Sequence, residues 1–361
     1  MGIGRVVALG ATARSLSRPM RGRRRALAGL RLLSFALLAA AFIAGPASAK
    51  QHKPPHKQQQ KKQQRQQKHR TSKRSGPVLP TRPPSPDGGW GYLIDKLNAD
   101  GVDRVRAAAI FSDPRVGEFE GLDFSLARSG ERHAMYRGFL RPNSIADAQR
   151  CRARYDAELL DAEDRFEVPA SVVSALLHVE THCGRNTGGS PVFARLARLA
   201  MANDPYNIRR NLARHTNGVP GARAATVERL VRLRARELEG VFYPEVLAMF
   251  TLEDRTGIDP LTLRGSGSGA FGLPQFLPSS YLRFAVDGNG DGRVSLYDPA
   301  DAIASAANYL ARHGWRPGIS YAQQRQVIWA YNHSDPYIDT VLIIAGEIER
   351  EQPSRRSLAE R

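Results

Sequence analysis

Acidic residues are missing from the first 76 positions of this 361-residue chain, although lysine and arginine are plentiful there. Residues 1–76 contain 18 of the 53 Lys and Arg, and the whole chain carries a net charge of +18. Subtracting those 18 leaves 35 basic and 35 acidic residues in the remainder, which is therefore electrically neutral. A folded domain that binds nucleic acid through charge is strongly basic. We therefore expect no nucleic-acid function for the folded part of the chain.

The N-terminal region also lacks a hydrophobic run long enough to cross a membrane. The uncharged stretch 32–45 has 14 residues, whereas a spanning helix needs about 20. Arginines precede it and the small residues 46–49 follow it, as in a cleaved secretory signal. We predict an export signal over 1–49 and a periplasmic or envelope-associated protein, soluble once the signal is removed. An uncleaved anchor is the alternative. No cysteine lies near the cleavage site, which argues against a lipid-anchored form.

Residues 50–88 lack the apolar side chains that a folded segment would bury. Lys, Gln, His, Arg and Pro dominate, and no apolar pattern begins before Val78. Such a segment cannot offset the entropy lost on ordering, so we predict a disordered linker. Its basic part is either a solvated spacer or a tether that contacts anionic envelope polymers.

Cysteine is scarce, with only Cys151 and Cys183 in the chain. We predict one helix over 144–165 and another over 169–182, joined by a short turn. In an antiparallel pair, the start of the first helix lies beside the end of the second, so the two cysteines are expected to be close. An exported compartment permits a disulfide between them. Two free buried thiols remain the alternative, because spacing does not fix the Cα separation.

Alternating runs typical of β-strands are scarce after Trp90. No internal repeat is visible, and the glycine-rich stretch 265–269 lacks the Gly-Lys-Ser/Thr of a phosphate-binding loop. That stretch suits either a close backbone approach to a bulky ligand or a flexible loop. We predict a mainly α domain over residues 89–361, with helices over 90–99, 144–165, 169–182, 191–202, 206–215, 223–239, 242–256, 299–313, 321–331 and 335–351.

The helix predicted over 169–182 carries a carboxylate on its apolar face. Leu177, Leu176 and Val173 precede Glu180 by three, four and seven residues, so they share its side of the helix. A carboxyl group that faces the core is desolvated and its pKa rises, as a general acid at neutral pH requires. Glu180 is therefore the candidate catalytic residue. The alternative is a solvated glutamate that faces outward.

Residues 287–298 follow the pattern of an EF-hand calcium loop. Asp287, Asn289 and Asp291 occupy positions one, three and five, and glycine occupies position six. Arg293 offers its carbonyl at position seven and Asp298 a carboxylate at twelve, where glutamate is usual. Asp298 also precedes a proline and suits a helix N-cap. We predict one structural Ca²⁺ ion, because the chain has no second loop of this kind.

Three segments, taken in order, resemble the B-type membrane-bound lytic transglycosylase family (MltB-like). The first is VET at 179–181, followed by GRNTG at 184–188. The second is GAFGLPQFLPSSY at 269–281, which leads into the calcium loop. The third contains ANYL at 307–310 and WAYNHS at 329–334. The resemblance covers residues 89–350, whereas the stretch 190–261 is longer and less familiar.

The resemblance implies a lysozyme-like (goose-type) helical core with an additional helical subdomain and one EF-hand-type loop. It implies that the chain binds peptidoglycan glycan strands and cleaves the β-1,4 bond between N-acetylmuramic acid and N-acetylglucosamine. We expect the protein to be a monomer. It places the catalytic glutamate at Glu180. It places saccharide contacts at Ser266, Gln275, Tyr309, Tyr331, Asn332 and Tyr337, although the tyrosines could instead be core residues with satisfied hydroxyl groups.

A single carboxylate suffices if the substrate supplies its own nucleophile. We expect Glu180 to protonate the glycosidic oxygen and then to take the proton of the C6 hydroxyl, which gives a 1,6-anhydro sugar. A lysozyme-type hydrolase and a catalytically silent peptidoglycan-binding protein are the two alternatives. The mass of the released product distinguishes all three.

Overall fold

The computed structural model describes residues 79–127 and 130–352. The chain separates into two units, Met1–Leu33 and Ser34–Arg361, and every described residue belongs to the second. The predicted export signal over 1–49 and most of the predicted linker over 50–88 lie outside the described residues. None of the described helices is long and apolar enough to cross a membrane.

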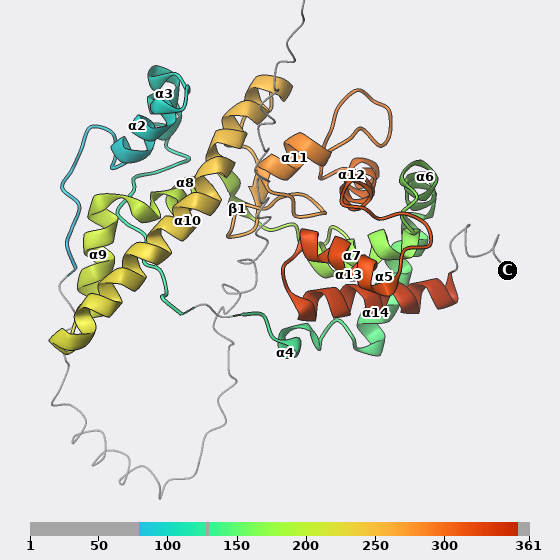
Figure 1. Cartoon of the computed structure of the whole chain (residues 1–361). Coiled ribbons are helices and arrows are strands. Elements are labelled where there is room, and N and C mark those ends of the chain that lie inside the picture. Colours follow the sequence, from blue (N-terminus) through green and yellow to red (C-terminus); the bar gives the residue numbers. More distant parts are fainter. Residues whose placement is uncertain (1–78, 128–129, 353–361) are drawn as a thin grey trace, which may run out of the picture. The chain divides into compact units, whose positions relative to one another are not determined.

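The described part of the chain is mainly helical, as the sequence predicts (Figure 1). Two-residue strands β1 (Ser190–Pro191) and β2 (Arg264–Gly265) pair in antiparallel register, with Ser190 opposite Gly265. The helices are α2 (Gly91–Ala99), α3 (Arg104–Phe111), α4 (His133–Tyr136), α5 (Pro142–Arg154), α6 (Asp156–Phe166), α7 (Ala170–Thr181), α8 (Val192–Ala200), η3 (Met201–Asn203), α9 (Pro205–Thr216), α10 (Gly221–Thr256), α11 (Pro278–Phe284), α12 (Pro299–Arg312), α13 (Tyr321–Tyr331) and α14 (Asp335–Glu351).

Two of the predicted helix boundaries are wrong. The single helix predicted over 144–165 is two helices, α5 and α6, because Tyr155 leaves helical geometry with φ −110° and ψ 37°. The two helices predicted over 223–239 and 242–256 are one helix of 36 residues, α10, which continues through Pro244. Helix α10 packs against α8, α9 and α11, and this packing stabilises it as one helix in spite of the proline. The short helices α3, α4 and α11 have no counterpart in the prediction.

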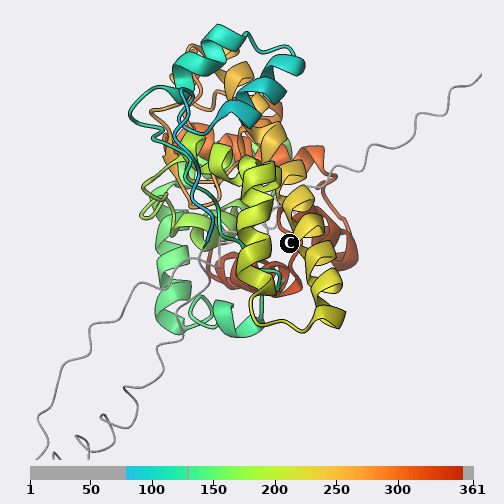
Figure 2. The same ribbon diagram turned by 90° about the vertical axis from the view of Figure 1, so that its left-hand side faces the viewer.

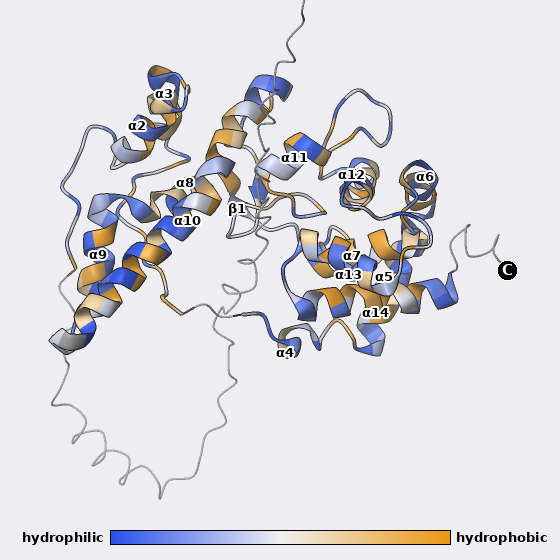
Figure 3. Ribbon diagram, in the orientation of Figure 1, coloured by the Kyte–Doolittle hydropathy of each residue, from blue (hydrophilic) through white to orange (hydrophobic). Residues whose placement is uncertain are grey.

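Helix α10 is amphipathic and packs with its apolar residues against neighbouring helices. Its first half lies beside α9 (Figures 1 and 2). Polar and apolar residues alternate along it (Figure 3), as expected where one face packs inward and the other faces water. Val231, Ala235 and Leu238 are among the buried residues of this inner face.

Helix α7 is the central helix of the core around the candidate site. It packs against α5, α6, α12 and α14. Eleven of its twelve residues are buried, and Glu180 is the exception. A left-handed His182 (φ 49°) ends the helix, so the chain turns directly after the glutamate. Burial on all sides fixes the position of α7, and therefore fixes the backbone of Glu180.

The two cysteines meet where α5 packs against α7. Cys151 on α5 and Cys183, two residues after α7, form a disulfide with 6.2 Å between their Cα atoms. The pairing follows from the antiparallel arrangement expected from the sequence, although α5 alone, and not a continuous 144–165 helix, provides the first partner. The bridge closes a 32-residue separation that contains α6 and α7, so it restrains the end of α7 next to Glu180.

Candidate active site

The side chain of Glu180 meets a tyrosine from the far end of the chain. The Tyr337 hydroxyl, on α14, donates a hydrogen bond to Glu180 Oε1 at 2.5 Å. Tyr337 is itself buried, with 2% of its surface exposed, so its ring is fixed by packing. Glu180 retains partial exposure, whereas its neighbours on α7 have almost none. The carboxyl group is therefore held in one orientation but remains open to a substrate on one side.

Burial is the main cause of the electrostatic character of Glu180. Desolvation raises the pKa of its carboxyl from 4.5 to about 7. The hydrogen bond from Tyr337 opposes this shift, because it stabilises the ionised form, and the negative charge of Glu131 adds to it. A carboxyl group with a pKa of about 7 can both donate and accept a proton at neutral pH. The sequence-based expectation of a desolvated general acid agrees with this geometry.

A second predicted tyrosine, Tyr331, lies close to Glu180, and a third, Tyr309, packs against Tyr331. Tyr331, at the end of α13, is buried and donates its hydroxyl proton to the carbonyl of Pro274. Burial and the charge of Glu180 raise the pKa of Tyr331 and of Tyr337 well above the usual value, so both hydroxyls stay neutral. The ring of Tyr309 meets that of Tyr331 edge-on, with centroids 4.8 Å apart. Its hydroxyl donates to Ala330 O at 2.7 Å, which is the core role weighed as the alternative.

Asn332 follows Tyr331 directly and has a buried side-chain acceptor without a partner among the described residues. Its side chain is buried, with 5% exposed. Its Oδ1 atom is buried and accepts no hydrogen bond from any described residue. An unmet buried acceptor is costly, so a ligand donor at this position would recover that free energy. This is the observation in the structure that best matches the predicted contact role of Asn332.

Gln275 and Ser266 shape the turn beside the site through their own hydrogen bonds. Gln275 takes a left-handed backbone (φ 50°), and its Nε2 donates to Gly272 O at 2.8 Å and Thr187 O at 3.1 Å. It thereby joins the segment after α7 to the glycine-rich turn. Ser266 Oγ accepts from the backbone N–H of Ala270 at 3.1 Å. Both side chains organise the backbone, whether or not they also contact a sugar.

The glycines of this turn serve close backbone contacts within the protein. A Cβ atom on Gly265 would lie 2.0 Å from Ala270 O, and one on Gly188 would lie 2.3 Å from Gly265 O. These distances exclude any side chain at either position. Glycine therefore allows the backbone of the segment after α7 to contact the backbone of the 265–271 turn. The sequence had suggested a close approach to a bulky ligand, or a flexible loop, whereas the close contact is with the protein's own backbone.

The predicted calcium loop turns through hydrogen bonds from its own backbone. Asp287 accepts from the N–H groups of Gly290 at 2.6 Å and Gly292 at 2.8 Å, and both glycines have positive φ. Asn289 accepts from Asp291 N at 3.0 Å, and Asp291 accepts from Arg293 N at 2.8 Å. Three predicted ligands thus line one tight turn. Across residues 79–127 and 130–352, no three His, Cys, Asp or Glu side chains gather closely enough to form a metal cluster.

Two aspartates after the loop have roles that the motif alone does not reveal. Asp298 caps α12, with Oδ1 accepting from Ala300 N at 2.9 Å, as its alternative N-cap role predicts. Asp301 is buried and accepts from Gly288 N at 2.8 Å and from Ser295 N at 2.7 Å. Asp301 therefore joins the two ends of the loop. Its position on the first turn of α12 was visible in the sequence, but the partners were not.

Two more residues of the site, Tyr136 and Glu131, belong to no motif of the sequence. Tyr136 is buried on α4, its ring meets that of Tyr337, and its hydroxyl donates to Glu131 Oε2 at 2.5 Å. No motif or periodicity marks the segment that contains them. Elsewhere, the buried Glu245 accepts from Ser279 N at 2.9 Å and Ser279 Oγ at 2.7 Å, and so fixes the start of α11.

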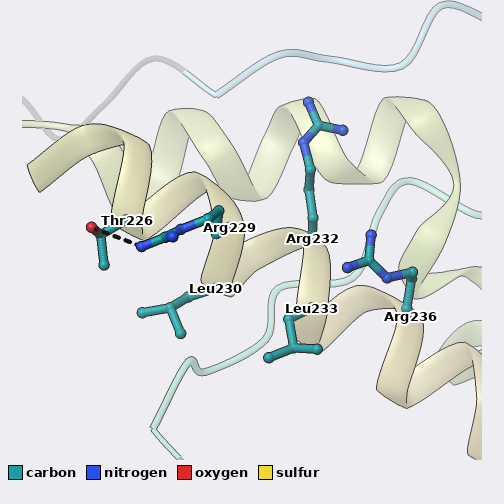
Figure 4. Close-up of a pocket in the computed structure, with 6 residues that line it drawn as sticks. All are labelled: Thr226, Arg229, Leu230, Arg232, Leu233 and Arg236. Carbon is teal, nitrogen blue, oxygen red and sulfur yellow. Dashed lines mark hydrogen bonds between the residues drawn. The ribbon is translucent and has the colours of Figure 1, made fainter.

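A separate hollow lies on the surface of α10 (Figure 4). All of its lining residues come from this one helix, and none is a carboxylate. The hollow therefore cannot provide acid–base chemistry, and it lies outside the group of residues around Glu180. Its lining residues are Thr226, Arg229, Leu230, Arg232, Leu233 and Arg236.

Comparison with known proteins gives consistent results. The profile of a family described as "Transglycosylase SLT domain" matches residues 93–327. Membrane-bound lytic murein transglycosylase B of Escherichia coli (strain K12) is 32% identical over 184 residues, which are 51% of this chain and 42% of that protein. The chain thus matches less than half the length of this curated relative.

Two solved structures share the fold. Soluble lytic transglycosylase SltB1 from Pseudomonas aeruginosa has a TM-score of 0.53 and 24% identity, covering 73% of this chain and 99% of that one. Escherichia coli lytic transglycosylase Slt35, in complex with calcium, has a TM-score of 0.52 and 24% identity, covering 74% of this chain and 94% of that one. Since the family profile covers most of the chain, this protein belongs to the transglycosylase SLT domain family.

Proposed function

We propose that this chain is a peptidoglycan lytic transglycosylase that cleaves the β-1,4 bond between N-acetylmuramic acid and N-acetylglucosamine. The observation that carries the proposal is Glu180, a partly exposed carboxyl whose pKa is about 7. Family membership supplies the substrate class. The tyrosines around Glu180 and the unmet acceptor of Asn332 fit a polar sugar chain.

In the first step, protonated Glu180 donates its proton to the glycosidic oxygen. The bond from C1 of the muramic acid to that oxygen breaks, and the leaving sugar departs with a free hydroxyl. The N-acetyl group of the muramic acid helps to stabilise the positive C1. Glu180 is now ionised, and the hydroxyl of Tyr337 stabilises this form by its hydrogen bond.

In the second step, the same carboxylate takes the proton from the C6 hydroxyl of the muramic acid. The C6 oxygen attacks C1, which closes a 1,6-anhydro ring and returns Glu180 to its acid form. No water is consumed. General acid–base catalysis of this kind contributes about 10²–10⁴ in rate.

Hydrolysis is the competing reaction, in which water attacks C1. Digestion of purified sacculi followed by mass spectrometry distinguishes the possibilities. Soluble muropeptides with 1,6-anhydro ends support the proposal, because they are lighter than hydrolysis products by one water. Products that retain that water would establish a lysozyme-type hydrolase, and no soluble product would leave only a binding role.

We propose that the 287–298 loop holds one structural Ca²⁺ ion. Side-chain oxygens of Asp287, Asn289 and Asp291 are the hard ligands that calcium prefers, and the carbonyl of Arg293 adds another. Asp298 caps α12 through Oδ1, which leaves Oδ2 for the ion. The solved relative Slt35 contains calcium. Calorimetry with Ca²⁺ after chelation should show binding heat, and its absence would refute the site.

We further propose that the protein is exported and works in the cell envelope, with residues 1–49 as the signal and 50–76 as a basic tether to anionic polymers. The pairing of Cys151 with Cys183 suits an oxidising compartment. N-terminal sequencing of the exported protein tests the cleavage. Retention of residues 32–45 would indicate an anchor. Light scattering of the purified protein tests the proposed monomer.

A further inference from the structure

A second carboxylate approaches Glu180 from the segment just before α4. Glu131 Oε2 accepts a hydrogen bond from the Tyr136 hydroxyl at 2.5 Å. The buried Tyr136 ring meets the Tyr337 ring edge-on, with 6.2 Å between centroids. The Tyr337 hydroxyl in turn donates to Glu180 Oε1. Each carboxylate therefore holds one tyrosine hydroxyl, and the two tyrosine rings are in contact between them.

The segment that carries Glu131 is fastened to the same helix as Tyr337. His133 Nε2 lies 3.0 Å from Asp339 Oδ2 on α14. Arg325 on α13 binds the other oxygen of Asp339 and also contacts Asp335 at 2.8 Å. These contacts hold the start of α4 against α13 and α14 on the side of Glu131. The charge of Glu131 is therefore fixed in place by more than its own hydrogen bond.

The charges around Glu180 are few within the described part of the chain. From α14, Tyr337 donates its hydrogen bond, and from α13 the neutral hydroxyl of Tyr331 lies near. Among the described groups that shift the pKa of Glu180, Glu131 is the only one with a formal charge. The charge of Glu180 in turn raises the pKa of Tyr136. No cation from α5, α6 or α12 is among them. A single nearby negative charge opposes ionisation of the carboxyl.

We propose that Glu131 is a positioning residue for the reaction proposed above: it holds Tyr136 against Tyr337, and its fixed negative charge adds to the burial that keeps Glu180 in its acid form. The inference rests on the proposed function for its catalytic meaning. The coupling between the two carboxylates does not depend on that function, because it rests on the two tyrosine contacts and on the charge of Glu131. Glu131 is not expected to touch the reacting atoms.

Glu131→Gln tests this coupling, because the amide oxygen can still accept the Tyr136 hydrogen bond while the charge is lost. We expect the alkaline limb of the pH–kcat/KM profile on sacculi to move to lower pH by roughly half a pH unit or more. The rate at low pH, where Glu180 is protonated in both proteins, should change little. Tyr136→Phe keeps the charge of Glu131 but removes the hydrogen bond that holds its carboxylate in place. The alkaline limb should therefore move in the same direction, by a smaller amount.

Glu351→Gln is the matched control, since this exposed residue ends α14, about 21 Å along the helix from Tyr337. Its profile should equal that of the wild type. A Glu131→Gln profile that is lowered equally at every pH would indicate a merely structural role and would overturn the proposal. An alkaline limb that stays at the wild-type pH in Glu131→Gln would also overturn the proposal.

Carboxyl ¹³C NMR gives a readout that does not depend on turnover. The titration midpoint assigned to Glu180, by its loss in Glu180→Gln, should fall in the full-length Glu131→Gln protein. An unchanged midpoint would refute the coupling. A lowered midpoint in a protein that releases no muropeptides would refute the proposed function and leave the coupling intact.

Discussion

Replacing Glu180 by glutamine should remove activity and, at alkaline pH, increase stability. The amide keeps the volume of the side chain and an oxygen to accept the Tyr337 hydrogen bond. It cannot donate or accept the catalytic proton, so turnover of sacculi should fall about 10²–10⁴-fold. The amide also avoids the cost of holding an ionised carboxylate in a desolvated position, and that cost can be measured independently of activity.

The structure sets the size of this stability effect. The pKa of Glu180 is about 7 in the folded protein against an ordinary value of 4.5. A carboxyl whose pKa is raised on folding contributes stability that is complete below pH 4.5 and is lost as the pH rises through 7. At about 1.4 kcal/mol per pH unit, the loss is about 3 kcal/mol, and partial exposure of the side chain reduces it to about 2 kcal/mol.

Urea unfolding at pH 4, 6 and 8, followed by far-UV circular dichroism, measures the effect. The free energy of unfolding of Glu180→Gln minus that of the wild type should increase by about 2 kcal/mol between pH 4 and pH 8. Glu351→Gln should show no such dependence. A Glu180→Gln difference that stays constant with pH would mean that Glu180 is well solvated in the folded protein, and the argument for a general acid would fail with it.

Three further predictions concern the surroundings of the site. Tyr337→Phe removes the hydrogen bond that lowers the pKa of Glu180, so the alkaline limb of the activity profile should rise by about one pH unit; a fall would contradict the assigned direction. Asp301→Ala leaves two backbone N–H groups of the loop unpaired and should lower the free energy of unfolding by about 2 kcal/mol, whereas Asp291→Ala, in the exposed turn, should lower it less under metal-free conditions. The double variant Cys151→Ser/Cys183→Ser opens a 32-residue separation and should lose about 2–4 kcal/mol in chemical denaturation; equal stability with and without reductant would refute that contribution.

Much of the site follows from local sequence patterns. The spacing of Val173, Leu176, Leu177 and Glu180 predicted a carboxylate among apolar core residues of α7, and in the structure Glu180 is the one partly exposed residue of a helix that is otherwise buried. The helical period depends only on neighbouring residues along the chain, so it could be read directly. The turn of the 287–298 loop is similarly local, because its aspartate and asparagine oxygens bind N–H groups two to five residues ahead.

Some boundaries were not predictable because packing overrode the local signal. Nothing in the composition around Tyr155 marks the break between α5 and α6. The break predicted between 239 and 242 is absent, since α10 continues through it and through Pro244 while it packs against α8, α9 and α11. The role of Asp301 was likewise hidden, because its partners Gly288 and Ser295 lie within the calcium motif, 13 and 6 positions before it.

The sequence alone determined the helical class, the helical spacing that sets Glu180 among apolar residues, and the turn of the loop, whereas it left the pairing of the two cysteines open. Only the tertiary structure decided the chemistry of the carboxyl group. Its pKa depends on desolvation, on Tyr337, which lies 157 positions further along the chain, and on Glu131, whose segment carries no motif. Such distances in sequence carry no periodic signal, whereas electrostatic free energy depends on distances in space.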